Sequence, residues 1–186
     1  MKKNSPYQFI VLEGISGSGK TEIGKRLSQQ ISAQYYTTPP AIFQKIRREA
    51  DETLSLQSRF LFYLSSVMQA SQEISGILET KSVVCDKYIW STICYHTAYG
   101  LNVKMPPLSF YLQPDYVFLI VCKEKERLQR LHDRGPIKDM VKHKLQQQIE
   151  RKCLVEFRKR IDRKIDNTAN DPQYAIERIL SVIQEG

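Results

Sequence analysis

Residues 9–21 of the chain read Phe9-Ile10-Val11-Leu12-Glu13-Gly14-Ile15-Ser16-Gly17-Ser18-Gly19-Lys20-Thr21. The first four form an apolar run of strand length, and the segment from Gly14 matches G-x-x-x-x-G-K-[ST] in full. Glycines let successive backbone N–H groups turn inward around a phosphate, and a helix starting near Lys20 points its positive end at the same anion. The stretch therefore predicts a buried strand, a phosphate-binding loop and a helix.

This loop predicts a site for the phosphates of ATP. The residues expected to bind them are Gly14, Ser16, Gly17, Ser18, Gly19, Lys20 and Thr21. Lys20 would reach the outer phosphates, and the Thr21 hydroxyl would ligate Mg²⁺. Asp86 ends the apolar run 82–85, where a carboxylate of such sites binds the metal. Thr21 and Asp86 are the predicted Mg²⁺ ligands; the alternative for Asp86 is a helix cap.

Apolar runs alternate with helical patterns along the whole chain. Strands are expected over residues 7–12, 34–37, 82–86, 116–121 and 164–167, and helices over 21–32, 54–78, 123–132, 140–162 and from 172. Such alternation predicts an α/β protein, namely a three-layer P-loop NTPase fold whose five-stranded parallel sheet has helices on both faces. We expect a single domain over residues 1–186, with a basic lid segment near 123–145.

Composition narrows the class of protein. Hydrophobic residues make up 41% and charged residues 26%, which is ordinary for a globular protein. No apolar run approaches the roughly 20 residues of a membrane helix, and no signal-peptide pattern is present, so we expect no membrane association. The four cysteines show no CxxC pair and no metal-ligand spacing. They predict reduced thiols and a cytoplasmic location.

Positive charge is concentrated in one part of the chain. Residues 123–164 contain 15 Lys/Arg and 7 Asp/Glu, a net +8 that equals the net charge of the whole sequence. Such a focus attracts phosphates, nucleotides or nucleic acid. Arg127, Arg130 and Arg134 recur at spacings of 3 and 4 on one helical face, which favours a lid over phosphates. Phe157 is the only Phe, Tyr or Trp in this segment, so a nucleic-acid-binding ATPase is disfavoured.

Three blocks of the sequence resemble the thymidylate kinase-like branch of the nucleoside monophosphate kinases. They are the loop block 9–21, the block 83–95, which looks like the family's Asp-Arg-Tyr motif with its following Ser and Ala-Tyr pair, and the block 114–121 leading to the lid arginines and Gly135. The resemblance covers roughly residues 7–184. It implies ATP- and Mg²⁺-dependent phosphoryl transfer to a nucleoside monophosphate, most directly dTMP or a related pyrimidine nucleotide. It also implies a homodimer through helices.

The resemblance places catalytic roles on Lys20, Asp86, Lys87, Arg130 and Arg134. Lys87 stands where the family has an Arg that clamps the acceptor phosphate; it keeps the charge but lacks the planar fork. The two lid arginines would close over the transferring phosphoryl group.

The acceptor-binding residues implied in the same way are Arg47, Phe62, Ser66, Gln69, Lys87 and Tyr95. Phe62 matches a ring that stacks on the acceptor base, and Tyr95 matches a tyrosine beside the sugar. Ser66 stands where the family has a base-reading Arg, and Gln69, one turn further on, could replace it. Arg47 could replace the phosphate-binding Arg that the segment 37–40 lacks.

Other functions stay open at this point. A nucleoside kinase or another small-molecule kinase must activate a neutral hydroxyl, for which Glu13 or Asp86 would be the base. Ser16, in place of a family Asp, and Lys87 also allow a kinase-like protein without activity.

Overall fold

The computed structural model describes residues 6–104, 106–133, 135 and 140–185. Its centre is one sheet in which all neighbouring strands are parallel, in the order β2-β3-β1-β4-β5. The strands are β1 Phe9–Glu13, β2 Gln34–Thr37, β3 Val83–Asp86, β4 Tyr116–Val121 and β5 Lys164–Asp166. In the central register Val11 lies between Cys85 and Val117. The predicted α/β class and five-stranded parallel sheet are confirmed.

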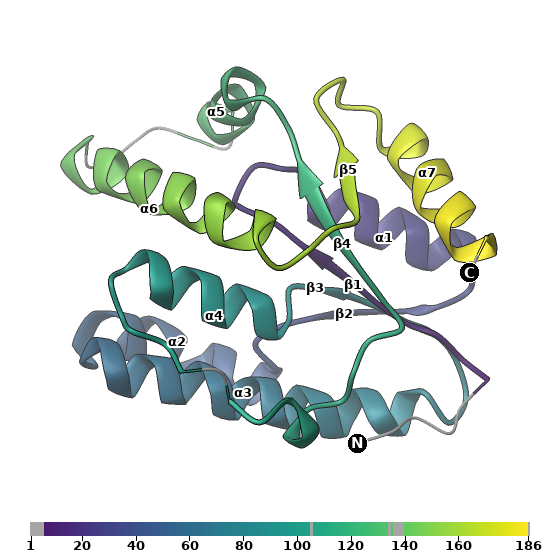
Figure 1. Ribbon diagram of the computed structural model, residues 1–186, viewed down its shortest axis with the longest axis horizontal. Coiled ribbons are helices and arrows are strands. Elements are labelled where there is room, and N and C mark those ends of the chain that lie inside the picture. Colours follow the sequence, from purple (N-terminus) through teal and green to yellow (C-terminus); the bar gives the residue numbers. More distant parts are fainter. Residues whose placement is uncertain (1–5, 105, 134, 136–139, 186) are drawn as a thin grey trace.

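Helices connect the strands and cover both faces of the sheet (Figure 1). They are α1 Lys20–Gln30, α2 Ala41–Thr53, α3 Leu56–Ile77, α4 Ile89–Ala98, α5 Glu124–His132, α6 Met140–Arg158 and α7 Pro172–Gln184, with a short 3-10 turn at Leu108–Phe110. α4 packs between α3 and α6 on one face, and α1 and α7 pack together on the other.

The alternation of side chains along β1 explains this layering. Phe9 and Val11 point into a core made with α3 and α4, whereas Ile10 and Leu12 point into a core made with α1 and α7. All four side chains are completely buried. A strand buried on both sides reads as a continuous apolar run, which is the pattern that marked residues 9–12 as a strand.

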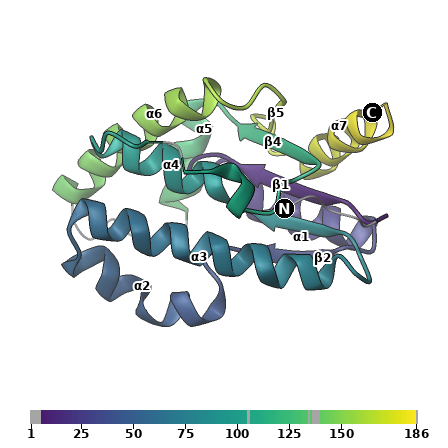
Figure 2. The same ribbon diagram turned by 60° about the horizontal axis from the view of Figure 1, so that its bottom comes forward.

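Two helices were not predicted, α2 and α4. α2 packs on the outer side of α3 (Figure 2), and Ala50 is its only buried residue. Ile42 and Ile46 are apolar residues one helical turn apart in its sequence, but both side chains are exposed. α4 was missed because it is buried on nearly every side, polar residues included, and so shows little amphipathic period.

The parallel sheet brings the carboxyl ends of its strands to one edge, so the loop after β1, Asp86 and Thr37 lie close together. In a parallel sheet this is the edge where ligands bind. Within the described residues, no helix is both long and apolar enough to cross a membrane.

Candidate active site

The glycines of the loop over residues 14–21 allow a backbone that other residues would not adopt. Gly14 has φ of 143°, and a Cβ there would lie 2.5 Å from the Ile120 carbonyl oxygen of β4. Gly19 has φ of 98° and precedes the first residue of α1. The loop therefore packs tightly against β4 and leads directly into the positive end of α1, an arrangement that favours bound anions.

Lys20 lies at the centre of this loop. Its Nζ donates to the Ile15 carbonyl at 2.8 Å and to the Ser18 hydroxyl at 3.3 Å, and the side chain is only 5% exposed. Burial, with help from the nearby charge of Lys87, lowers the pKa of Lys20 to about 8. Its positive charge is thus only partly compensated, which suits a group that meets a phosphate.

Thr21 and Asp86 meet as predicted for neighbouring strand ends. The Thr21 hydroxyl donates to Asp86 Oδ2 at 2.6 Å, and the Tyr35 hydroxyl donates to the same oxygen at 3.1 Å. Asp86 Oδ1 is buried and has no hydrogen-bond partner among the described residues. An unpartnered carboxylate oxygen beside a hydroxyl offers the hard oxygen ligands that Mg²⁺ prefers. The residues therefore fit a magnesium ion.

Two arginines of α5 contact the loop from the side of β5. Arg127 is completely buried; it pairs with Glu124 at 2.8 Å, donates to the Ser16 carbonyl at 3.2 Å and contacts Gln147. Arg130 donates to the carbonyls of Asn167 and Gly17 at 2.6 and 3.4 Å. In this structure both guanidinium groups therefore donate to groups of the protein itself. Arg134 lies outside the described residues.

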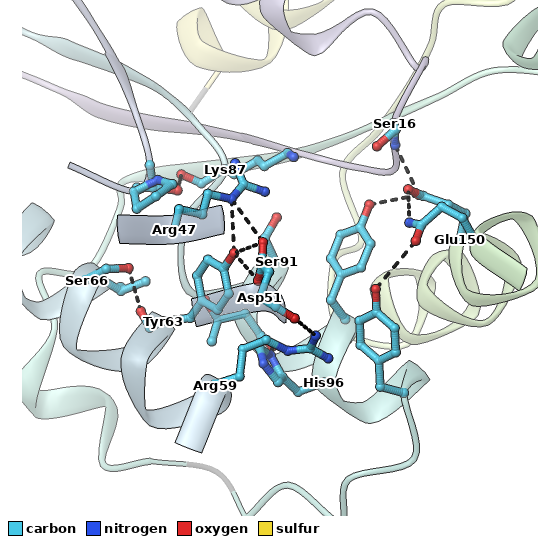
Figure 3. Close-up of a pocket in the computed structure, with 17 residues that line it drawn as sticks. Ser16, Arg47, Asp51, Arg59, Tyr63, Ser66, Lys87, Ser91, His96 and Glu150 are labelled. Carbon is cyan, nitrogen blue, oxygen red and sulfur yellow. Dashed lines mark hydrogen bonds and ion pairs between the residues drawn. The ribbon is translucent and has the colours of Figure 1, made fainter. Parts of the chain in front are cut away.

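Two cavities open beside the loop. The first, which we call the loop cavity, has a volume of about 430 Å³ and is lined by Lys20, Thr21 and Asp86. The second, the α3–α4 cavity, has a volume of about 330 Å³ and extends between those two helices (Figure 3). Both cavities are lined by Ser16, Thr38, Arg47 and Lys87. A ligand in each would therefore meet at these four residues.

One wall of the α3–α4 cavity is a hydrogen-bonded cluster from α2 and α3. Arg47 Nε donates to the Tyr63 hydroxyl at 3.0 Å, and that hydroxyl donates to Asp51 Oδ1 at 2.9 Å. Arg59 donates to the Asp51 carbonyl at 3.3 Å and lies over the Tyr99 ring, 4.7 Å from its centroid. Of this cluster, sequence reasoning had named only Arg47.

A buried carboxylate from α6 forms the opposite wall. Glu150 is 1% exposed; its Oε2 accepts hydrogen bonds from the Ser16 backbone N–H at 3.1 Å and from the Tyr95 hydroxyl at 2.8 Å. Its Oε1 accepts one from Gln146 at 3.1 Å. Sequence reasoning missed Glu150, because it lies 134 residues from Ser16 inside a basic helix with no local signal.

Of the predicted acceptor contacts, the structure brings four to this cavity and leaves two outside. Arg47, Ser66, Lys87 and Tyr95 line it.

Phe62 and Gln69 are not among the described residues that line either cavity. The Phe62 ring packs against Phe43 and Tyr63, and Gln69 donates to Glu73 at 3.0 Å. The acceptor-binding roles of these two side chains therefore stay predictions, which the cavities of this structure do not support. The side chains of Arg59 and Tyr63, one helical turn apart, occupy the cavity face of α3 instead.

Glu13 does not reach a cavity either. Its carboxylate accepts hydrogen bonds from the backbone N–H of Tyr88 at 2.9 Å and of Ser91 at 3.2 Å, and from the Ser91 hydroxyl. Burial raises its pKa to about 7. These contacts fix the segment between β3 and α4, including Lys87, whose backbone has φ of 70°.

Comparison with known proteins assigns the family. The sequence profile of the thymidylate kinase family matches residues 12–179. Probable thymidylate kinases of Methanococcus vannielii and Pyrococcus horikoshii are 32% and 30% identical, over 68% and 72% of this chain and 67% and 74% of theirs.

Solved structures share the fold. The thymidylate kinase of Candida albicans superposes with a TM-score of 0.78 at 20% identity, covering 98% of this chain and 93% of its own. The thymidylate kinase of Ehrlichia chaffeensis gives 0.65 at 19% identity, with 95% and 98% covered. The resemblance carried by the three sequence blocks is confirmed, and the chain belongs to the thymidylate kinase family of ATP-dependent nucleotide kinases.

Proposed function

We propose that the protein transfers the terminal phosphoryl group of ATP to a nucleoside monophosphate, dTMP or a related pyrimidine nucleotide. The observation that carries this proposal is the pair of adjoining cavities. The loop cavity has the size and the phosphate-binding groups for the ATP phosphates, and the α3–α4 cavity has room for a second, smaller ligand. Lys87 and Arg47 line both cavities, so they would bind the acceptor phosphate where it faces the ATP.

The protein's own residues divide the work of phosphoryl transfer. Lys20 and the N–H groups of residues 14–21 would bind the ATP phosphates, and Lys87 and Arg47 would orient the acceptor phosphate for in-line attack. Thr21 and Asp86 would bind Mg²⁺, which supplies charge neutralisation on the phosphates when bound. Arg130 and Arg134 would supply positive charge at the transferring group if α5 and the following segment close over the loop.

A free nucleoside is the second candidate acceptor, because two carboxylates line the α3–α4 cavity. Attack by a hydroxyl calls for a base, and Asp51 and Glu150 are available there. Glu13 lines neither cavity and Asp86 lines only the loop cavity, so these two bases proposed from the sequence are less suited.

ADP release tests the two acceptors directly. The assay contains ATP, Mg²⁺ and either a pyrimidine nucleoside monophosphate or its matching nucleoside, with Lys20→Ala as the blank. Turnover with a monophosphate and none with its nucleoside is the expected result. Turnover with nucleosides alone would show that the protein phosphorylates a hydroxyl group and not a phosphate group.

The proposal includes three further properties, namely cellular location, domain organisation and oligomeric state. A cytoplasmic location is supported by the free thiols of all four cysteines, since reducing compartments keep thiols unpaired. One domain with a lid near residues 123–145 is supported by the contacts of α5 with the loop. A homodimer through α3 is supported by Leu61 and Met68, which expose 63% and 40% of their surface. Molar mass by light scattering tests the dimer.

A further inference from the structure

His96 of α4 has a defined tautomer. Its Nδ1 lies 2.7 Å from the Thr92 carbonyl oxygen, one turn earlier in the helix. A carbonyl oxygen can only accept, so Nδ1 carries the proton in the neutral ring and Nε2 carries the lone pair. Burial lowers the pKa of His96 below its usual value, which keeps the ring neutral at physiological pH. Nε2 is therefore a hydrogen-bond acceptor.

This acceptor has no partner. His96 is 3% exposed, lines the α3–α4 cavity, and its Nε2 is buried with no hydrogen bond from any residue that the structure describes. The rings of Phe60 and Tyr63 pack against it, with centroids 5.2 and 5.7 Å away, and fix its orientation. A buried acceptor without a donor loses the hydrogen bonds that water would give it, which is unfavourable. A ligand that supplies the missing N–H would remove this cost.

His96 lies at the end of the cavity away from the phosphates. The end shared with the loop cavity is marked by Ser16 and Lys87, at the top of Figure 3, while His96 and Arg59 lie at the bottom. α4 begins at Ile89, and seven residues of helix place His96 about 10 Å further along the axis. A nucleotide with its phosphate at Lys87 would thus direct its base toward His96.

Several other polar groups at this end are already engaged. The Asp51 carboxylate accepts from Tyr63, Arg59 donates to the Asp51 carbonyl, and the Ser66 hydroxyl donates to the Tyr63 carbonyl at 2.8 Å. Ser66 is short and turned to its own helix, so it does not take over base recognition from the Arg that the family has there. Among the described residues that line this cavity, His96 Nε2 is the buried side-chain acceptor without a donor, and Arg59 lies at the same end (Figure 3).

We propose that His96 determines base specificity: its Nε2 accepts a hydrogen bond from an N–H group on the outer edge of the acceptor base, next to a base oxygen or nitrogen that Arg59 can contact. This inference rests on the proposed function, since it assumes a nucleotide in the α3–α4 cavity. Among the pyrimidines, two kinds of donor have the required chemistry. Thymine or uracil would donate its ring N3–H, and cytosine would donate its amino group.

The test compares dissociation constants, measured by calorimetry, for parent and methylated nucleotides. 3-Methyl-dTMP lacks the ring N–H, and N4,N4-dimethyl-dCMP lacks the amino donors. Wild type and His96→Phe are titrated with each pair; the variant keeps a flat ring but has no acceptor. Phe60→Leu, which disturbs the same packing without removing Nε2, is the matched control, and His96→Gln restores an acceptor.

For one of the two pairs, we expect wild type and Phe60→Leu to bind the parent at least about tenfold more tightly than the methylated compound. In His96→Phe that ratio should fall to near one, and His96→Gln should recover part of it. The pair of compounds whose ratio changes in His96→Phe identifies the base group that donates to Nε2. An unchanged ratio in His96→Phe would mean steric exclusion of the methyl group and a purely packing role for His96.

Other outcomes are equally decisive. If His96→Phe does not fold, wild type alone decides, because equal binding of parent and methylated compounds overturns the inference. Nucleotides that bind with the predicted ratios but are not phosphorylated would contradict the proposed function and leave the recognition role standing. Phosphorylation of dTMP or dCMP that does not depend on His96 would support the proposed function and overturn the recognition role of His96.

Discussion

Lys20 and Glu13 are two ionisable side chains that folding removes from water, and the surroundings of each decide its charge. Lys20 meets only a carbonyl and a hydroxyl, so burial dominates and lowers its pKa to about 8. Glu13 accepts three hydrogen bonds that favour the carboxylate, yet complete burial outweighs them and raises its pKa to about 7. Both groups therefore change charge close to neutral pH.

Activity should fall on the alkaline side because of Lys20. The lysine is charged below its pKa, so kcat/KM for ATP should decrease above about pH 8, roughly tenfold per pH unit. At saturating ATP the bound phosphates stabilise the charged amine, and the decrease in kcat should begin at higher pH. Steady-state kinetics from pH 6.5 to 10 measures both. A flat kcat/KM up to pH 9.5 would contradict this assignment.

Stability should depend on pH through Glu13. The ordinary pKa of 4.5 applies to the unfolded chain and about 7 to the folded one, so between these values only the folded state binds the proton. The free energy of unfolding should therefore fall as pH rises from about 4.5 to about 7, by about 3 kcal/mol, and level off above. Glu13→Gln should lack this fall.

Urea unfolding at pH 5, 6, 7 and 8 measures how the free energy of unfolding changes with pH. Glu79→Gln, an exposed carboxylate, is the control and should track wild type. Parallel pH dependence in Glu13→Gln and wild type would show that Glu13 is ionised in the folded protein throughout.

At the scale of elements, α5 supports the phosphate-binding loop. Arg127 joins Glu124, Gln147 of α6 and the Ser16 carbonyl, so one completely buried guanidinium connects two helices to the loop. The arginine spacing in the sequence predicted a helical face turned to phosphates. In the structure, Arg127 and Arg130 of this face donate to backbone carbonyls of the loop, and only long-range packing could reveal that.

Replacing Arg127 tests this support. Arg127→Met leaves the Ser16 carbonyl without its donor and removes a buried ionic contact, so we expect a loss of about 2–4 kcal/mol in unfolding free energy. The dissociation constant for ATP should rise about tenfold, because the loop loses an anchor. Denaturation and ATP titration measure the two effects.

Arg151→Met is the matched control. Arg151 contacts the same Glu124 at 3.2 Å, but its side chain is 65% exposed. Exposed pairs contribute little, so this variant should lose less than about 1 kcal/mol and bind ATP as wild type does. Equal losses in the two variants would mean that the Glu124 pair, and not the buried loop contact, is what matters.

The helix α3 shows how far sequence reasoning reaches at this scale. Its existence was predictable over residues 54–78, because apolar residues recur at helical spacing, and the structure ends it within two residues of each predicted end. Its rotation was not predictable. Residues next to each other differ by about 100° around the axis, and Tyr63, the neighbour of Phe62, is the ring that lines the cavity.

At the scale of the whole molecule, the sheet topology brings the two cavities together. The order of β2, β3 and β1 places Thr37, Asp86 and residues 14–21 at one edge, and a local motif was enough to predict this. Asp51, His96 and Glu150 come from three helices with no local motif. Only the packed fold brings them to one cavity, so the sequence indicated the ATP side far better than the acceptor side.

Adjoining cavities predict strong binding of a single molecule that fills both. A compound joining adenosine and thymidine through five phosphates should raise the melting temperature more than ATP and dTMP added together at the same concentration, since linkage replaces a second binding event by an intramolecular one. The same compound with adenosine at both ends is the control. Equal shifts from the two linked compounds would argue against a pyrimidine site between α3 and α4.

The most direct test of the central claim is the identity of the phosphorylated product. Equal amounts of dTMP and thymidine are incubated with ATP, Mg²⁺ and the protein, and ion-exchange chromatography separates and quantifies thymidine, dTMP and dTDP, with Lys20→Ala as the blank. We predict that dTDP appears while the amount of thymidine stays unchanged. An increase in dTMP at the expense of thymidine, without dTDP, would contradict a nucleoside monophosphate kinase.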